Sequence, residues 1–335
     1  MNFNKLIYDH ELLMVKKIWI GLAFFAAAMG LSLPVQGQDY PSKPIKIVSP
    51  YAPGGGTDLA LRILSDRLQK KWGQPAVVEY RPGAGGNIGA ELVFRSPPDG
   101  YTLLLTPPPP LVINKHLYKK LSFDPGAFVP VSLISESPNV LLVRTGLPID
   151  SLQQLINFAK ENPGRLNYAS PGDGSTPHLT AELFKSMTAV KLTHIPFNGT
   201  GPAIVALLGE HVDMMFSEIS AAIPHIRAGK VRALAVSSEK RSPSLPDVPT
   251  VSEVLPGFVS MTSGNLVAPP LTPPAIVNKL SAAIAEIMRE PEIAKRFLEL
   301  SAVAVGSTPA EHALVLKQDS DRWEKVIRLT GTRMD

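Results

Sequence analysis

The chain has 335 residues and a formal net charge of +4, from 33 Lys and Arg against 29 Asp and Glu. It contains no cysteine, which excludes a lipoprotein anchor, a disulfide framework and thiol chemistry. The small charge, without a basic run or interleaved aromatic and basic residues, gives no sign of nucleic-acid binding, and the length suggests two domains.

The N-terminus has the three parts of a secretory signal peptide. Lys16 and Lys17 precede the apolar run "IWIGLAFFAAAMGLSLPV", and "VQG" ends it with small or slim residues at Val35 and Gly37. A charged region, an apolar region and a small-residue cleavage site together make such a signal. Residues 1–37 are therefore predicted to be removed after export, with a retained membrane anchor as the alternative.

From residue 45 onward, short β-branched runs alternate with helical patterns. Strands are predicted at 45–49, 76–79, 102–105, 131–135, 140–144, 166–169, 191–195, 212–216 and 233–237. Helices are predicted at 58–71, 87–95, 151–162, 177–188, 202–208, 219–228, 274–289, 291–300 and 309–330. Strands separated by single helices indicate βαβ units, so an α/β fold with mostly parallel sheets is expected.

Three segments share one arrangement, in which a strand ends, a glycine-rich loop follows and a helix begins. They are "IVSPYAPGGGTDLA", "NYASPGDGSTPHLT" and "HIPFNGTGPAIV", and "VEYRPGAGGNIGAE" is a weaker fourth. Such loops lie at the carboxyl ends of strands, where open α/β sheets bind ligands. Thr176 is predicted as a helix N-cap before Pro177, and Thr200 has similar chemistry before Pro202. Several helix starts with free N–H groups, aimed at one cleft, would make an anion site.

The loops favour a carboxylate over a phosphate. The sequence has no G-x-x-x-x-G-K-[ST] motif, and no Lys or Arg follows the glycines of the three main loops. In "GAGGNIG" the third Rossmann glycine is replaced by Ile88. A carboxylate can be held by N–H groups, hydroxyls and water without a guanidinium, and hydroxyls are supplied by Thr57, Ser175, Thr176 and Thr200.

Catalytic and metal-binding patterns are weak. Ser175, His178 and Asp173 lie close in sequence, but there is no G-x-S-x-G elbow, and His178 is expected to be a neutral surface residue of the first helical turn. The seven histidines are scattered, so neither a metal site nor a cofactor is predicted. A secreted serine hydrolase that uses Ser175 and His178 is the alternative from a different class.

Two acidic residues adjoin the glycine-rich loops. Asp58 either caps a helix or binds a ligand amine, and capping is favoured because acids stabilise the first helical turn. Glu218 follows the apolar strand "VDMMF" and lies either at the rim of a cleft or in solvent. At a rim it would accept an amine, which would make the ligand an amino acid.

The mature chain resembles the tripartite tricarboxylate transporter substrate-binding proteins, of the TctC or Bug type, over essentially its whole length. The matching blocks include "YPSKPIKIVSPYAPGGGTDLALRIL", "GQPAVVEYRPGAGGNIGAELVFRSPPDGYTLLL", "LNYASPGDGSTPHLTAELFK", "PHIRAGKVRALAVSSEKRSPSLPDVPTVSEV" and "FLELSAVAVGSTPAE". The resemblance implies a periplasmic-binding-protein-like fold, with two Rossmann-like α/β domains, a hinge and a ligand cleft between them. The implied domains are 38–137 with 239–335, and 138–238, with crossings near "SESPN" and "SSEKR".

The resemblance also implies a function. The protein would capture a small organic acid in the periplasm and deliver it to the membrane components of a secondary transporter, without catalysis. Because the sequence gives no evidence of obligate oligomers, a monomer is expected. Two opposed loops, 51–58 and 170–176, would hold the ligand carboxylate. The implied ligand-binding residues are Tyr51, Pro53, Gly54, Gly55, Gly56, Thr57, Asp58, Thr106, Ser170, Gly172, Gly174, Ser175, Thr176, Phe197, Asn198, Gly199, Ser217 and Glu218.

Three segments near the expected pocket depart from the family pattern: "LTPPPPLVIN", "FSEIS" and "MTSGNLVAPP". Prolines 107–110 stiffen one wall and remove its N–H donors, so a bulkier and more apolar ligand is predicted on that side. Two further alternatives are a receptor that feeds a signalling partner and a protein whose altered loops no longer bind a ligand.

Overall fold

The computed structural model describes residues 40–334, so the predicted signal peptide at 1–37 lies outside the described residues. The strands are β1 (Ile45–Ser49), β2 (Ala76–Tyr80), β3 (Thr102–Thr106), β4 (Val129–Arg144), β5 (Asn167–Ser170), β6 (Thr193–Pro196), β7 (Met214–Glu218), β8 (Val231–Val236), β9 (Met261–Ala268) and β10 (Val303–Ala304). The α-helices are α2 (Gly56–Trp72), α3 (Asn87–Phe94), α4 (Asn114–Leu117), α5 (Leu152–Glu161), α6 (Thr176–Thr188), α7 (Thr200–Leu208), α8 (Ile219–Arg227), α9 (Pro274–Arg289), α10 (Pro291–Glu299) and α11 (Pro309–Thr330).

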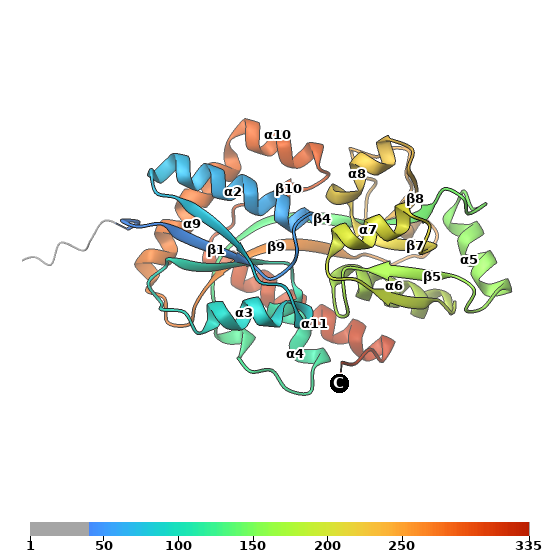
Figure 1. The fold of residues 1–335 in the computed structure, drawn as a ribbon, viewed down its shortest axis with the longest axis horizontal. Coiled ribbons are helices and arrows are strands. Elements are labelled where there is room, and N and C mark those ends of the chain that lie inside the picture. The colour runs from blue at the N-terminus through green and yellow to red at the C-terminus, as the bar shows by residue number, and fades with distance from the viewer. Residues whose placement is uncertain (1–39, 335) are drawn as a thin grey trace, which may run out of the picture. The chain divides into compact units, whose positions relative to one another are not determined.

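The strands of the described chain follow the order β2-β1-β3-β9-β4-β7-β5-β6, with β8 and β10 pairing with β4 beside this path. We call the part built on β1, β2, β3 and β9 the first lobe, and the part built on β5, β6, β7 and β8 the second lobe. In Figure 1, α2 lies above and α3 below the strands of the first lobe, and α7 and α8 lie above β5 in the second. This is the two-domain α/β fold predicted from the sequence.

Strand β4 belongs to both lobes. Its first part, from Val129 to Pro138, pairs with β9, and its second part, from Asn139 to Arg144, pairs with β7 and β8. We predicted two strands here, at 131–135 and 140–144, with a crossing between the domains near "SESPN". The prediction of a break is wrong: Pro138 stands where the strand changes partners, so the strand continues through it.

The sheet is less parallel than predicted. Strand β1 pairs in parallel with β2 and β3, and β5 pairs in parallel with β6 and β7. All the ladders of β4 and the β3–β9 ladder are antiparallel. The difference arises from β4, which runs antiparallel to each of its partners, and from β9, which was not predicted because its buried residues include Thr262, Ser263 and Asn265.

Alternate residues of β4 supply the cores on the two faces of the second lobe. Leu141 and Val143 pack in one cluster with Phe184 and Phe216, while Leu142 packs in another with residues of α7 and α8. This alternation is the two-residue period of a strand that is covered on both faces.

The limits of the domains stay a prediction, but the packing favours a later boundary for the second one. Val251 and Phe258, which lie in the segment assigned to the first domain, pack in the same cluster as Leu141 and Phe216. We therefore propose that the second domain extends to about Ser260.

Ser237 joins the chain segments that pass between the lobes. Its Oγ accepts the N–H of Asn139 at 2.8 Å and donates to the carbonyl of Ser260, and its N–H donates to the carbonyl of Asn139 at 2.7 Å. These three residues are buried. This group of buried hydrogen bonds, which we call the Ser237 node, fixes how the segments that contain Asn139, Ser237 and Ser260 align with one another.

Replacing Ser237 with alanine is expected to lower the free energy of unfolding by about 1.5 kcal/mol, because it leaves the buried Asn139 N–H without its acceptor. The measurement is urea denaturation of wild type and variant. Ser238→Ala is the matched control, since its hydroxyl donates only to the exposed carbonyl of Lys240, and it should change the free energy by less than about 0.5 kcal/mol. Equal effects of the two substitutions would contradict the role of the node.

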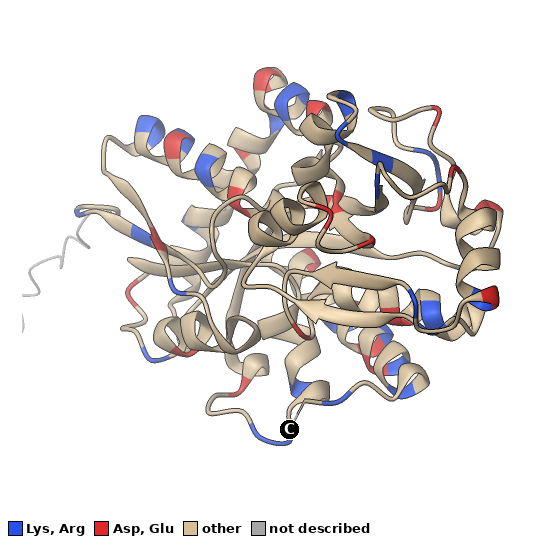
Figure 2. Ribbon diagram, turned by 45° about the vertical axis from the view of Figure 1, so that its right-hand side comes forward, with Lys and Arg blue, Asp and Glu red and all other residues tan. Residues whose placement is uncertain are grey.

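Charged residues of both signs are interspersed over the ribbon (Figure 2). Several form ion pairs between elements, such as Arg67 with Glu292 and Arg241 with Glu253. Of the helices between residues 40 and 334, none is both long and apolar enough to cross a membrane.

Candidate functional site

The glycine-rich loops of the two lobes converge on one small cavity of about 30 Å³. The loops after β1, β5 and β6 all contribute, as does the end of β7. The lining residues are Ser49, Tyr51, Ala52, Gly55, Thr57, Asp58, Pro107, Pro109, Pro171, Ser175, Thr176, Pro177, Gly199, Thr200 and Glu218. The N-termini of α2, α6 and α7 therefore meet around a single space, as expected at the carboxyl ends of strands.

The start of α2 has no side-chain cap of its own. Its N-cap is Gly55, and the carboxylate of Glu218, from the other lobe, accepts the N–H of Gly56. The glycines permit this approach, because a Cβ on Gly56 would lie 2.9 Å from Glu218 Oε2 and 2.1 Å from Ser220 Oγ. Bare backbone is thus needed where the two lobes touch.

Asp58 holds the loop before α2. Its Oδ2 accepts the N–H of Gly54 at 3.0 Å and the Nε of Arg62 at 3.1 Å, and its Oδ1 accepts the hydroxyl of Tyr80 at 2.7 Å. Both carboxylate oxygens are therefore engaged within the lobe. Asp58 therefore lies in the first turn of α2, as predicted, but the prediction that it caps the helix is wrong, because it accepts from Gly54 ahead of the helix and α2 has no side-chain cap.

The start of α6 is capped one residue earlier than predicted. Ser175 is the N-cap, with its Oγ accepting the N–H of His178, and Thr176 is the first helical residue. The prediction of Thr176 as the N-cap is therefore wrong, because the hydroxyl of Ser175 already fills that role. Thr200 differs in the same way, since the N-cap of α7 is Gly199. Thr176 is only 1% exposed, and within residues 40–334 its Oγ1 has no hydrogen-bond partner.

His178 is buried, and the prediction of a surface histidine is wrong. Its ring stacks on that of His194 at 4.1 Å between centroids, and His194 stacks on Tyr168 at 4.8 Å. Burial lowers the pKa of His178 to about 3, helped by the neighbouring His194 and Lys185. Its Nδ1 accepts the N–H of Gly174 at 3.0 Å, so a neutral ring supports the loop before α6.

The side chains of Ser175 and His178 are not arranged as nucleophile and base. Ser175 Oγ donates to the carbonyl of Gly172 at 2.6 Å, while His178 Nδ1 accepts from the backbone. Potential metal-ligand atoms of Asp173, His178 and His194 lie within 4.8 Å of one another. However, the two His194 nitrogens already face Ser170 Oγ at 2.6 Å and Asp173 Oδ1 at 3.3 Å. This cluster therefore has a structural role in the loop.

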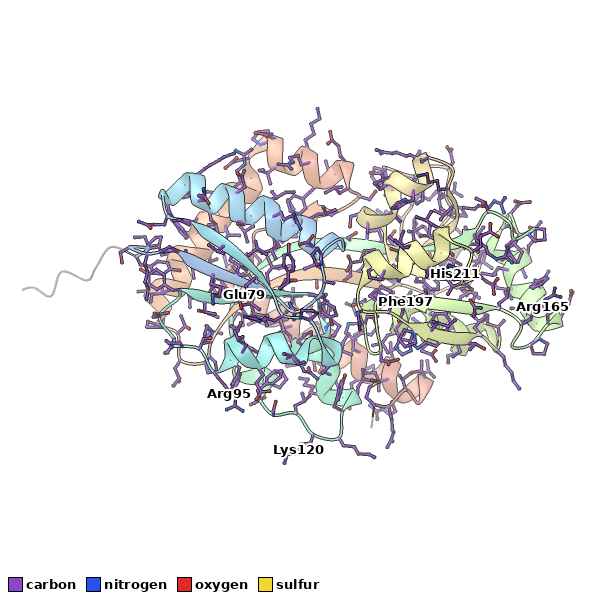
Figure 3. The ribbon with its side chains drawn as sticks, viewed as in Figure 1. Glu79, Arg95, Lys120, Arg165, Phe197 and His211 are labelled. Atoms are coloured by element: carbon purple, nitrogen blue, oxygen red, sulfur yellow. The ribbon has the colours of Figure 1, made fainter. Side chains whose placement is uncertain are left out.

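A second cavity, of about 290 Å³, adjoins the first and shares Tyr51, Ala52 and Pro171 with it. Its remaining lining comes from both lobes and from the C-terminal end: Pro82, Gly83, Ala84, Gly85, Gly86, Tyr118, Gly172, Asp173, Pro196, Phe197, Asn198 and Met334. Phe197 is labelled on the loop after β6 in Figure 3. Tyr51 separates the two spaces, and its hydroxyl donates to the carbonyl of Gly85 at 2.9 Å.

Residues 60–332 match the model of the tripartite tricarboxylate transporter family receptor. The chain belongs to this receptor family. It is 37% identical over 316 residues to the protein BugT of Bordetella pertussis, an alignment that covers 93% of this chain and 97% of BugT. The family resemblance drawn from the sequence is confirmed, and the chain is a solute-binding protein of the TctC and Bug family.

Two solved structures of Rhodopseudomonas palustris proteins are similar to this receptor. The structure of Rpa4515 with adipate has a TM-score of 0.86 and 34% identity, covering 88% of this chain and 99% of that one. The structure of MatC with bound malate has a TM-score of 0.82 and 34% identity, covering 86% of this chain and 100% of that one.

The receptor brings together part of the predicted site. The first cavity is lined by the predicted residues Tyr51, Gly55, Thr57, Asp58, Ser175, Thr176, Gly199 and Glu218. The second is lined by the predicted residues Tyr51, Gly172, Phe197 and Asn198. The structure places the others outside both linings: Pro53, Gly54, Gly56, Thr106, Ser170, Gly174 and Ser217.

Several of these outer residues have other contacts. The hydroxyl of Thr106 donates to the carbonyl of Pro107, that of Ser217 to the carbonyl of Glu218, and that of Ser170 contacts His194. Gly56 lies at the contact between the lobes. These residues therefore support the conformation of the loops without lining either cavity.

Two residues that line the first cavity, Ser49 and Pro177, lie one or two positions outside the predicted loops 51–58 and 170–176. Ala52 and Pro171 lie within those loops but were not named among the ligand-binding residues. The predicted proline wall contributes Pro107 and Pro109 to the lining. Pro110, which packs at the buried start of the η2 turn (Pro109–Ile113), does not.

Proposed function

We propose that this protein is a periplasmic receptor that captures a small organic acid in the cavity between its lobes and delivers it to the membrane components of a tripartite tricarboxylate-type transporter. Export would follow from the signal peptide predicted at residues 1–37. Family membership supports the transport role, and the similar structures with adipate and malate support a carboxylate as ligand. The receptor would act as a monomer and without a catalytic step.

The observation that carries this proposal is the unpartnered hydroxyl of Thr176. A buried polar atom without a partner is unfavourable, so it calls for an explanation. Thr176 lines the cavity at the first turn of α6, where the helix dipole favours an anion. A ligand carboxylate placed there would accept a hydrogen bond from Oγ1 of Thr176.

Closure of the lobes would complete the site. Gly56 from the first lobe donates to Glu218 from the second, and the position of a Cβ on Gly199 lies 3.3 Å from Cβ of Ala52. A ligand that contacts both lobes stabilises the closed form relative to the open one, because only the closed form makes both sets of contacts.

A thermal-unfolding screen tests the proposed function. The protein would be unfolded and refolded to remove bound ligand, then heated with mono-, di- and tricarboxylates, aromatic acids and amino acids. A ligand at one hundred times its dissociation constant stabilises by about 2.7 kcal/mol, which raises the melting temperature by several degrees. A shift with at least one carboxylate is expected. Correct refolding without a shift from any carboxylate would contradict the proposal.

Thr176→Val is expected to weaken carboxylate binding about tenfold, or about 1.4 kcal/mol, by removing the proposed hydrogen bond. The unliganded protein should keep its stability, because the hydroxyl has no partner to lose. Thr176→Ser is the matched control and should bind nearly as well as wild type. The measurement is isothermal titration calorimetry. Equal affinities of the valine and serine variants would remove Thr176 from the site.

A further inference from the structure

The N-terminus of α2 already holds a carboxylate of the protein itself. Glu218 is the last residue of β7 and is 6% exposed. Its Oε2 accepts the N–H of Gly56, and a Cβ on Gly55 would lie 3.2 Å from the same atom. One of the helix starts that the sequence suggested for a ligand anion is therefore occupied by an internal anion.

Among the described residues that line the first cavity, none is a cation that could compensate Glu218. Of the fifteen lining residues of the first cavity, Asp58 and Glu218 carry carboxylates, and none is Lys, Arg or His. Asp58 is paired with Arg62 behind the loop, whereas Glu218 faces the main-chain N–H groups of Gly56 and Thr57. The negative charge in the cavity is thus offset only in part.

The groups that face Glu218 from the neighbouring elements are polar or acidic. Tyr51 and Asp58 face it from the loop after β1 and from α2, Thr200 lines the same cavity from α7, and Asn139 is its neutral partner on β4. Burial raises the pKa of Glu218, and Asp58 adds to the rise, against the N–H groups of Gly56 and Thr57. A second carboxylate in this space would repel Glu218, whereas a cationic donor would pair with it.

We propose that Glu218 makes the site select ligands that carry an ammonium group beside their carboxylate, namely amino acids, over dicarboxylates of similar size. The inference rests on the proposed capture of a carboxylate at α6, with Thr176 binding the carboxylate and Glu218 the ammonium. Both residues line the same cavity of about 30 Å³. The two ligand groups must therefore be close together, as in an α-amino acid.

The side chain of such a ligand has a defined direction. The adjoining cavity of about 290 Å³ is reached past Tyr51, Ala52 and Pro171, which line both spaces. Its wall includes Phe197 and Tyr118. An amino acid anchored in the first cavity would extend its side chain into the second.

Matched ligand pairs test the inference on the unmodified protein, purified after expression of the full-length chain. The pairs are 2-aminoadipate with adipate, glutamate with glutarate, and phenylalanine with 3-phenylpropanoate, and each pair differs only in the ammonium. Calorimetry should give at least tenfold tighter binding for the ammonium-bearing member of whichever pair binds. Equal or tighter binding of the ammonium-free member would overturn the role of Glu218.

The Glu218→Gln variant tests whether the preference for ammonium-bearing ligands depends on the Glu218 side chain. The amide oxygen can still accept from Gly56, but the charge is gone, so the preference for the ammonium should fall at least tenfold. Glu161→Gln, an exposed change at the end of α5, should leave the preference intact. An unchanged preference in Glu218→Gln would overturn the inference.

The outcomes separate this inference from the proposed function. Tight binding of ammonium-free acids that is weakened by Thr176→Val would leave carboxylate capture standing and overturn only the selection by Glu218. Binding of no acid, with or without an ammonium, would overturn both.

Discussion

Replacing Gly56 with alanine is expected to weaken ligand binding by roughly five- to 150-fold, without loss of folding. The added methyl would lie 2.1 Å from Ser220 Oγ, so the lobes could not reach their present contact without a shift, and such overpacking costs about 1–3 kcal/mol. The change suits α2 itself, because alanine is a better helix former than glycine. Calorimetry with the acid that gives the largest thermal shift is the measurement.

A second substitution tests the cause of this loss. In Gly56→Ala/Ser220→Ala the closer of two colliding oxygens is removed, which leaves Glu218 Oε2 at 2.9 Å and Cβ of residue 220 at 3.4 Å from the added methyl. Affinity should recover in part, as a coupling between positions 56 and 220. Gly201→Ala, on the same face, is the control, because its Cβ would lie 3.4 Å from the carbonyl oxygen of Pro53. A double variant as weak as the single one would refute the collision.

His178 alone is expected to lower the free energy of unfolding by about 2 kcal/mol as the pH is lowered from 6.5 to 5. Its pKa in the folded protein is lowered to about 3, chiefly by burial, whereas in the unfolded chain it is about 6.5. Between these values the unfolded state binds the proton and the folded state does not. Acid therefore favours unfolding across this window, with a slope of up to about 1.4 kcal/mol per pH unit.

Urea denaturation at pH 7, 6 and 5 measures this dependence. His178→Asn should reduce the dependence by about half, since an asparagine oxygen can accept from Gly174 and does not titrate. His211→Asn, at an exposed position, should leave the slope of wild type. His312, buried on α11 with its pKa also lowered to about 3 by burial, should keep a residual slope in the variant. An unchanged slope in His178→Asn would show that other groups govern the acid sensitivity.

The elements that the sequence predicted well are those with local signals. Helices α9 and α11 begin at Pro274 and Pro309 and were predicted with the bounds that the structure has, because a proline at N1 and an amphipathic period are local features. Strand β9 lacks such a signal, since its buried residues include serine, threonine and asparagine, and the partners of Asn265 include the distant Thr106 and His312. Strand β4 was predicted as two strands, and the change of pairing partner at Pro138 shows how a single strand serves both lobes.

The residues of the site likewise divide into those with a local sequence signal and those that depend on distant contacts. The loops around Gly55, Thr176 and Gly199 were found because glycines and hydroxyls before a helical period are visible in the sequence. The contact of Glu218 with Gly56 joins residues 162 positions apart, so no local sequence pattern could predict it. The burial of His178 likewise depends on stacking against His194 from the next strand, so residue type alone suggested a surface position.

Strand β4 has a mechanical consequence for the receptor. One continuous strand of 16 residues runs from one lobe into the other. At β4, therefore, the lobes are not joined by a flexible loop that could act as a hinge. Opening must bend and twist a hydrogen-bonded ribbon through small dihedral changes shared among several residues, unlike a hinge in which a few residues absorb large changes. Twisting β4 therefore stores elastic strain energy in one arrangement of the lobes, and this energy is released when the lobes move back toward the other arrangement.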